Sequence, residues 1–437
     1  MPLALIAFAM VATFMTLVMT KRLSALLALM LIPTLFALAA GFHAGLGEMM
    51  IEGVRSLAPT GVMLLFAILY FGIMMDAGLF DPLIRTIVRL VHGDPVKVAL
   101  GTVGLCLIVS LDGDGTTAYM ICIAALLPLY RHLRMDRRVL ACLLIMASAV
   151  MNIAPWGGPT VRAATALHVD ARDVFVPLIP AMAATAAWTF FVAWRLGLRE
   201  RRRLASMPCE PDSEIAEEVV AEEAGGDLSL KRPALFWVNL GLTCALLVFL
   251  ITGVIPLVPL FMLAFALAAM VNYPQLDMQR ARIAAHAGNA MGTASLVFAA
   301  GVFTGVLSGT KMVDAMAGTV LGIIPSWLGP YMAPIVAIVS IPFTVLISND
   351  AFYFGMLPVL AQTGVTYGIG PVEMARASLV GQQIHLLSPL VASTYLLVGQ
   401  TDIDLGDHQR FTWKWGLGAC GVFLVVGLVT GVFPLRR

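Results

Sequence analysis

The chain has 437 residues, of which 60% are hydrophobic and only 12% are charged, and its mean hydropathy is +0.92. A soluble domain carries about 25% charged residues, so this composition excludes a soluble globular protein, a disordered chain and a nucleic-acid-binding protein. The 27 basic and 26 acidic residues nearly cancel, which indicates no class of charged partner. We therefore expect an integral protein of the lipid bilayer.

Apolar segments long enough to cross about 30 Å of hydrocarbon predict ten membrane spans. They cover residues 2–20, 23–41, 57–75, 139–168, 174–195, 235–252, 255–272, 289–308, 371–399 and 412–433. The first is followed, not preceded, by Lys21 and Arg22. That is the reverse of the order in a signal peptide, so we interpret this segment as a retained span.

Two further apolar stretches, residues 96–130 and 330–362, are each interrupted near the middle by polar residues. The interruptions are Asp-Gly-Asp-Gly-Thr-Thr at 112–117 and Ser-Asn-Asp at 348–350. Each stretch is either two tightly joined spans or a hairpin that enters and leaves on one side. Basic residues in short loops accumulate on the cytoplasmic side. If both stretches are hairpins, one membrane topology places most of the basic groups on the cytoplasmic side and both termini outside.

The sequence divides into three parts. Residues 1–195 hold five spans and the first interrupted stretch, and residues 235–437 hold five spans and the second, in the same order. Because an odd number of spans precedes the central segment, any repeat between the halves must be inverted. Residues 196–234 contain a run of arginines and then a run of acids, and we expect a cytoplasmic linker. The alternative is a regulatory or metal-binding acidic segment.

Polar breaks also occur at matching distances in the two halves. Asp114 and Asn152 lie 38 positions apart, and Asp350 and His385 lie 35 positions apart. Inverted repeats with interrupted spans are typical of secondary transporters, whose binding site lies near mid-membrane where the breaks meet. We therefore predict an all-α polytopic membrane protein, an inverted-repeat secondary transporter with two re-entrant hairpins and broken helices.

Acidic residues in the breaks are the strongest functional candidates. Asp112 and Asp114 resemble the start of a calcium-binding loop, but position twelve is Ile123 where an EF-hand requires a bidentate Glu. A simple turn is the plain alternative. Carboxylates at membrane depth mark ion or proton pathways, so we expect Asp112, Asp114 and Asp350 to bind a metal or accept a coupling proton. Together they would repel unless a cation or shared protons neutralise them.

Other polar residues and glycines in the breaks are candidate ligands for a carboxylate substrate. Helix N-termini there attract anions, and glycine permits close backbone approach. The candidates are Gly113, Thr116, Thr117, Asn152, Gly157, Gly158, Thr160, Ser348, Asn349 and Ser388, with Gln382, Gln383 and Ser393 as weaker ones. For each side chain the alternative is a hydrogen bond between packed helices.

Two further side chains carry ionisable groups. His385 is the only histidine in a predicted break and could titrate near neutral pH, which makes it a candidate for proton coupling. A structural histidine is the alternative. Arg162 could hold an anion or extend to the outer interface, and we favour the interface.

Five segments resemble the CitMHS family, the citrate:proton symporters that carry citrate complexed with a divalent metal. The segments are residues 19–26, 111–117, 152–160, 348–355 and 388–389. The resemblance covers nearly the whole chain and implies a bacterial inner-membrane transporter of the ion transporter superfamily. It also implies a scaffold, a mobile transport domain with two hairpins, elevator-type alternating access and a homodimer.

The resemblance implies import of citrate complexed with Mg²⁺ or Ca²⁺ by proton symport. The metal is then part of the substrate, and no cofactor is bound permanently. The related sodium-coupled carriers have Ser-Asn-Thr in each hairpin tip, where this chain has additional acids. Such acids suit a metal-complexed or proton-coupled substrate. The metal offsets part of the citrate charge, so the complex needs few basic residues in the core.

Two alternatives remain open. One is a sodium-coupled symporter of free dicarboxylates or tricarboxylates with the same fold, which excess magnesium would inhibit. The other is a channel or a membrane-embedded enzyme. A metal-dependent hydrolase would need a cluster such as His-Glu-x-x-His, which the sequence lacks, and the six cysteines have no Cys-x-x-Cys spacing for a zinc or redox site.

Overall fold

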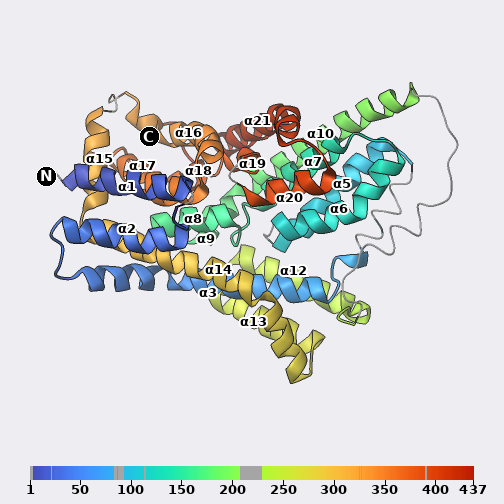
Figure 1. Ribbon diagram of the computed structural model, residues 1–437, viewed down its shortest axis with the longest axis horizontal. Coiled ribbons are helices and arrows are strands. Elements are labelled where there is room, and N and C mark those ends of the chain that lie inside the picture. Colours follow the sequence, from blue (N-terminus) through green and yellow to red (C-terminus); the bar gives the residue numbers. More distant parts are fainter. Residues whose placement is uncertain are drawn as a thin grey trace.

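The structure is a computed structural model, in which the regular structure of the described residues is entirely helical (Figure 1). The described residues are 3–20, 22–82, 86, 93–112, 115–206, 229–323, 325, 327–388 and 391–437. The predicted all-α class is therefore confirmed for this part of the chain.

Six helical runs in the described residues are long and apolar enough to cross a membrane. They are α3 (Leu46–Asp76), α9 to α10 (Ala171–Ala205), η3 with α12 (Pro233–Thr252), α14 (Leu276–Gly309), η4 with α16 (Gly329–Leu346) and α21 (Leu405–Val429). Shorter apolar helices include α1 (Leu3–Met19), α2 (Ala25–Ala39) and α13 (Leu257–Asn272). Every predicted span overlaps at least one of the helices found.

The bounds of several elements differ from the prediction. Both α3 and α14 begin more than ten residues before the predicted spans 57–75 and 289–308. Helix α10 (Ile179–Ala205) continues into the predicted linker, and α15 (Met312–Ile323) was not predicted. Helices extend beyond their apolar parts because polar residues at a membrane surface continue a helix as readily as they end it. Residues 207–228 of the predicted linker lie outside the described residues.

Both interrupted stretches form pairs of helices separated at the predicted polar residues. We call these pairs the first and the second hairpin. The first consists of α5 (Pro95–Val109), a short 3-10 turn η1 (Ser110–Asp112) and α6 (Gly115–His132). The second consists of α16 (Met332–Leu346), a π-helical turn η5 (Ala351–Met356) and α17 (Leu357–Thr366). In Figure 1, α5 and α6 lie toward the right of the view, α16 and α17 lie toward the left, and α19 lies between the two pairs.

Two of the predicted spans are discontinuous, as their Gly, Pro and polar residues suggested. Span 139–168 forms α7 (Arg137–Met151) and α8 (Gly158–Leu167). Span 371–399 forms α18 (Pro371–Ser378), α19 (Gln382–His385) and α20 (Ala392–Thr401). Helix α7 is central, because every side chain from Val139 to Val150 is buried.

The helices α3 and α14 pack against each other in antiparallel directions. Gly53 near the start of α3 faces Gly301 and Gly305 near the end of α14, and Gly72 near the end of α3 faces His286. A Cβ atom at Gly53 would lie 2.0 Å from the carbonyl oxygen of Gly301. Small residues therefore allow the two backbones to touch, which is a common way to pack helices in membranes.

Trp156 fixes the α7–α8 break against two other parts of the fold. Its indole Nε1–H donates to the carbonyl oxygen of Leu111 in η1 at 2.8 Å. Its ring centroid lies 5.0 Å from that of Phe71 on α3 and 5.5 Å from that of Phe261 on α13. The break is thus held between η1 on one side and helices α3 and α13 on the other.

Candidate functional site

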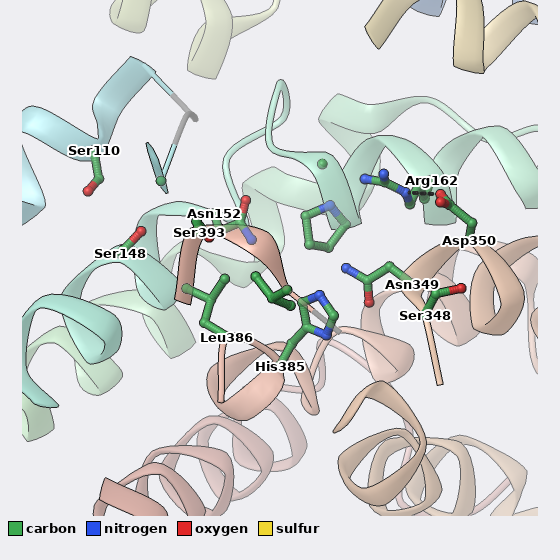
Figure 2. Close-up of a pocket in the computed structure, with 14 residues that line it drawn as sticks. Ser110, Ser148, Asn152, Arg162, Ser348, Asn349, Asp350, His385, Leu386 and Ser393 are labelled. Atoms are coloured by element: carbon green, nitrogen blue, oxygen red, sulfur yellow. Dashed lines mark hydrogen bonds and ion pairs between the residues drawn. The ribbon is translucent and has the colours of Figure 1, made fainter. Parts of the chain in front are cut away.

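A cavity of about 410 Å³ lies where the four breaks meet. The described residues that line it are Ser110, Gly115, Ser148, Asn152, Gly158, Pro159, Arg162, Ser348, Asn349, Asp350, His385, Leu386, Val391 and Ser393. Figure 2 shows Ser110 of the first hairpin on one side of the cavity and Asp350 of the second hairpin on the other. Residues far apart in the sequence are therefore brought to one cavity.

The first hairpin contributes Ser110 and Gly115 to the cavity. Gly113 and Asp114, between them, lie outside the described residues, as do the side chains of Asp112, Thr116 and Thr117. The roles predicted for these five residues therefore stay predictions.

The α7–α8 break contributes Asn152 and Gly158, together with Ser148 one helical turn earlier. Gly157 does not line the cavity, and a Cβ atom there would lie 2.0 Å from the carbonyl oxygen of Asn152. The hydroxyl of Thr160 donates to the carbonyl oxygen of Ile153 at 2.7 Å, and this side chain is fully buried. Gly157 and Thr160, predicted as substrate ligands, thus shape the break and do not face the cavity.

The second hairpin contributes Ser348, Asn349 and Asp350. The amide of Asn349 exchanges two hydrogen bonds with Gln382 of α19, at 3.3 Å and 3.0 Å. The Gln382 amide also donates to the hydroxyl oxygen of Tyr353 at 3.0 Å. Asn349 is therefore oriented by a polar network with Gln382 and Tyr353.

The end of α16 is capped by side chains from the break after α19. A helix that ends inside a membrane leaves carbonyl oxygens that need donors. The His385 Nδ1–H donates to the Thr344 carbonyl oxygen at 2.6 Å, and the Ser388 hydroxyl donates to the Val345 carbonyl oxygen at 2.7 Å. Ser388 was predicted as a substrate ligand, but the structure places it against this helix end and not among the cavity-lining residues.

The capping bond also sets the chemistry of His385. A carbonyl oxygen can only accept, so Nδ1 carries the ring hydrogen. In the neutral imidazole, Nε2 then holds a lone pair and can accept a proton. His385 lines the cavity, where such an acceptor is within reach of what enters it.

An ion pair crosses the cavity wall between α8 and the second hairpin. Arg162 Nε donates to Asp350 Oδ1 at 2.6 Å, and the two side chains are 24% and 17% exposed (Figure 2). The expectation that Arg162 extends to the outer interface is wrong. For Asp350 the sequence predicts a neutralising cation or shared protons, and the structure places the Arg162 guanidinium against this carboxylate.

The described lining residues offer hydroxyl and amide donors, one cation and one anion. Such a set can hold carboxylate oxygens through Arg162, Asn152 and the serines. The Asp350 carboxylate is in turn a suitable oxygen ligand for a hard divalent cation. The arrangement therefore suits a ligand that carries both carboxylates and a metal ion.

Comparison with known proteins assigns the family. A model of the CitMHS family, described as a citrate transporter, matches residues 3–381. The chain belongs to the CitMHS citrate transporter family. A citrate transporter from Bacillus subtilis (strain 168) is 56% identical over 432 residues, which are 98% of this chain and 99% of the relative. A Mg(2+)/citrate complex secondary transporter from the same organism is 48% identical over 434 residues, which are 99% of each chain.

Two solved structures share the fold of this family member at low sequence identity. The YdaH transporter of Alcanivorax borkumensis has a TM-score of 0.59 and 16% identity, and the match covers 89% of each chain. MtrF of Neisseria gonorrhoeae has a TM-score of 0.63 and 15% identity over 89% of this chain and 84% of its own. These two likenesses concern the fold. The family match and the two relatives make the chain a transporter and not an enzyme, and its apolar helices indicate a multi-pass membrane protein.

Sequence reasoning missed Ser110 and Ser148 and misplaced Arg162. For Ser148 and Arg162, the spacing of residues along a helix could have predicted a place near the break. Ser148 lies four positions before Asn152 and so shares its helix face. Arg162 lies four positions after Gly158, the first residue of α8, and helical side chains lean back toward the helix N-terminus and hence toward the break. The partner of Arg162 could not be read from spacing.

Proposed function

We propose that this protein imports citrate complexed with a divalent metal ion, Mg²⁺ or Ca²⁺, by proton symport across a bacterial inner membrane. The observation that carries the proposal is the cavity between the four breaks, which presents an Arg162–Asp350 pair among hydroxyl and amide groups. A 48% identical relative is a Mg(2+)/citrate complex secondary transporter, which supports the same substrate here.

The proposed roles follow from the donors and acceptors in the cavity. Asn152, Asn349 and Ser348 hold citrate carboxylates, since amide N–H and hydroxyl groups donate to carboxylate oxygens. Asp350 ligates the metal of the complex. Asp112 and Asp114 remain proposed metal or proton ligands on the strength of the sequence alone.

His385 is a proposed carrier of the coupling proton, in addition to Asp112, Asp114 and Asp350. Its Nδ1–H is committed to the Thr344 carbonyl oxygen at 2.6 Å, so Nε2 is the atom that takes up the proton. A proton gained there adds positive charge next to an anionic complex. This couples proton uptake to substrate binding through electrostatic attraction.

The proposed movement is of elevator type between two inverted repeats, residues 1–195 and 235–437, in a homodimer. In this proposal the two hairpins and the α7–α8 break belong to the moving part. The α3–α14 pair, which runs through the molecule with its backbones in contact, belongs to the scaffold. The matching order of breaks in the two halves supports the repeat.

Uptake of labelled citrate into proteoliposomes tests this function. Uptake is measured under an inward proton gradient with EDTA, magnesium, calcium or sodium, each with and without a protonophore. We expect uptake that requires one divalent ion and that collapses with the protonophore. Uptake that persists in EDTA and follows a sodium gradient would contradict the proposal and favour a sodium-coupled carrier. Flux without saturation would favour a channel.

A further inference from the structure

The charged side chains of Arg162 and Asp350 in the cavity pair with each other. Its partners come from different helices, α8 and the second hairpin, 188 positions apart in the sequence. In the described lining residues no other Arg, Lys, Asp or Glu faces the cavity, and His385 is the only other titratable group. Among the described lining residues, the two charges of the pair therefore compensate each other.

Opening this pair leaves two opposite charges that both need a partner. A buried or half-buried charge left alone is strongly unfavourable. Free citrate could replace Asp350 at Arg162, but its carboxylates would then repel the released Asp350. A free divalent ion could replace Arg162 at Asp350, but it would repel the released guanidinium.

A metal–citrate complex supplies both missing partners at once. It has carboxylate oxygens for the guanidinium, which binds them as charge-assisted hydrogen bonds. It also has a divalent ion for the Asp350 carboxylate. The pair is thus complementary to the complex and to neither of its components.

We propose that the Arg162–Asp350 pair is the element that selects the metal–citrate complex over free citrate. The pair parts on binding, Arg162 then holds a citrate carboxylate, and Asp350 ligates the metal. This inference rests on the proposed function and adds to it Arg162 as a substrate-binding residue and a reason for the metal requirement.

Gly158 positions Arg162 for this role. A Cβ atom at Gly158 would lie 2.6 Å from Nη1 of Arg162, so the guanidinium occupies the space above this glycine. The contact is with the tip of a flexible side chain. Gly158→Ala therefore displaces the guanidinium, whereas the backbone of the break keeps its path.

Isothermal titration calorimetry on the purified full-length protein tests the selection. Citrate is titrated in EDTA and in magnesium, and magnesium chloride is titrated alone. We expect the wild type to bind citrate in magnesium at least about tenfold more tightly than in EDTA. In Asp350→Asn the neutral amide no longer repels free citrate, so this ratio should fall toward one.

Asp402→Asn is the matched control, because it also removes an aspartate from an arginine, Arg137, at 2.9 Å, outside this cavity. Its ratio should equal that of the wild type. An Asp350→Asn protein with the wild-type ratio would overturn the inference and leave the proposed function standing. A wild type that binds citrate equally well in EDTA, or in neither condition, would overturn the metal–citrate function itself and this inference with it.

Gly158→Ala provides a second test that does not depend on the folding of Asp350→Asn. We expect its affinity for citrate in magnesium to fall by about tenfold or more. Its unfolding temperature should equal that of the Asp402→Asn control. Wild-type affinity in this variant would overturn the role of Arg162.

Discussion

Thr160 illustrates how one buried hydroxyl can be taken for a ligand. It follows a Gly-Gly-Pro sequence in a break, as a substrate-binding residue would. In the structure its hydroxyl donates to the carbonyl oxygen of Ile153, which the break leaves without a helical partner. Its contribution is therefore to the stability of the break.

Replacing Thr160 distinguishes these two roles. Thr160→Val keeps the shape but leaves the Ile153 carbonyl oxygen without its donor, which costs about 1–3 kcal/mol of unfolding free energy. Thr160→Ser keeps the hydroxyl and is the control. We expect a lower unfolding temperature for the valine variant only, with an unchanged KM for citrate uptake in both. A raised KM with an unchanged unfolding temperature would make Thr160 a ligand.

At the scale of elements, the breaks and the long helices were predictable to different degrees. Gly, Pro and Asp inside apolar runs located all four breaks, because these residues act on the backbone next to them. The α3–α14 pair was not foreseen. Gly301 and Gly305 lie in a segment that sequence alone reads only as apolar, and Gly53 lies before the predicted span 57–75. The function of these glycines depends on what lies opposite them.

Substitution of Gly53 tests the contact between α3 and α14. In Gly53→Ala the Cβ atom would lie 2.0 Å from the Gly301 carbonyl oxygen and 2.8 Å from the Gly305 Cα, so the backbones must separate. We expect a loss of about 1–3 kcal/mol, the usual cost of overpacking, seen as a lower unfolding temperature in detergent.

Gly292→Ala on α14 is the matched control for this change. A Cβ atom at Gly292 has no neighbour within 4 Å, so its unfolding temperature should stay at or slightly above that of the wild type. Equal unfolding temperatures for the two variants would show that α3 and α14 do not meet at Gly53.

For the molecule as a whole, the proposed elevator movement requires the α7–α8 break to leave α3 during transport. The rings of Phe71 on α3 and Trp156 in the break lie 5.0 Å apart in this state. Cysteines at both positions, joined by a short bifunctional thiol reagent that contains a disulfide, would tie the two parts together. We expect the cross-linked protein to lose nearly all citrate uptake, to keep citrate binding and to recover uptake after reduction.

Each single cysteine variant is the control, and its uptake should be the same with and without the reagent. Full uptake by the cross-linked double variant would show that the contact between α3 and the break persists throughout the cycle. The moving part would then have to include α3.

The sequence by itself determined the membrane class, the helical content, the positions of the breaks and the resemblance to a citrate transporter family. These follow from hydrophobicity along the chain and from residues that act on their own backbone, so they need no knowledge of distant neighbours. It also singled out Asn152, Asp350 and His385, because polar groups are rare in apolar spans.

Only the tertiary structure decided which atoms these residues contact. It joined Arg162 to Asp350 across 188 positions and His385 to Thr344 across 41. It also turned Thr160 and Ser388 toward backbone carbonyl oxygens and away from the cavity. An ion pair or a helix cap depends on which atoms meet in space, and local patterns in a sequence do not contain that information.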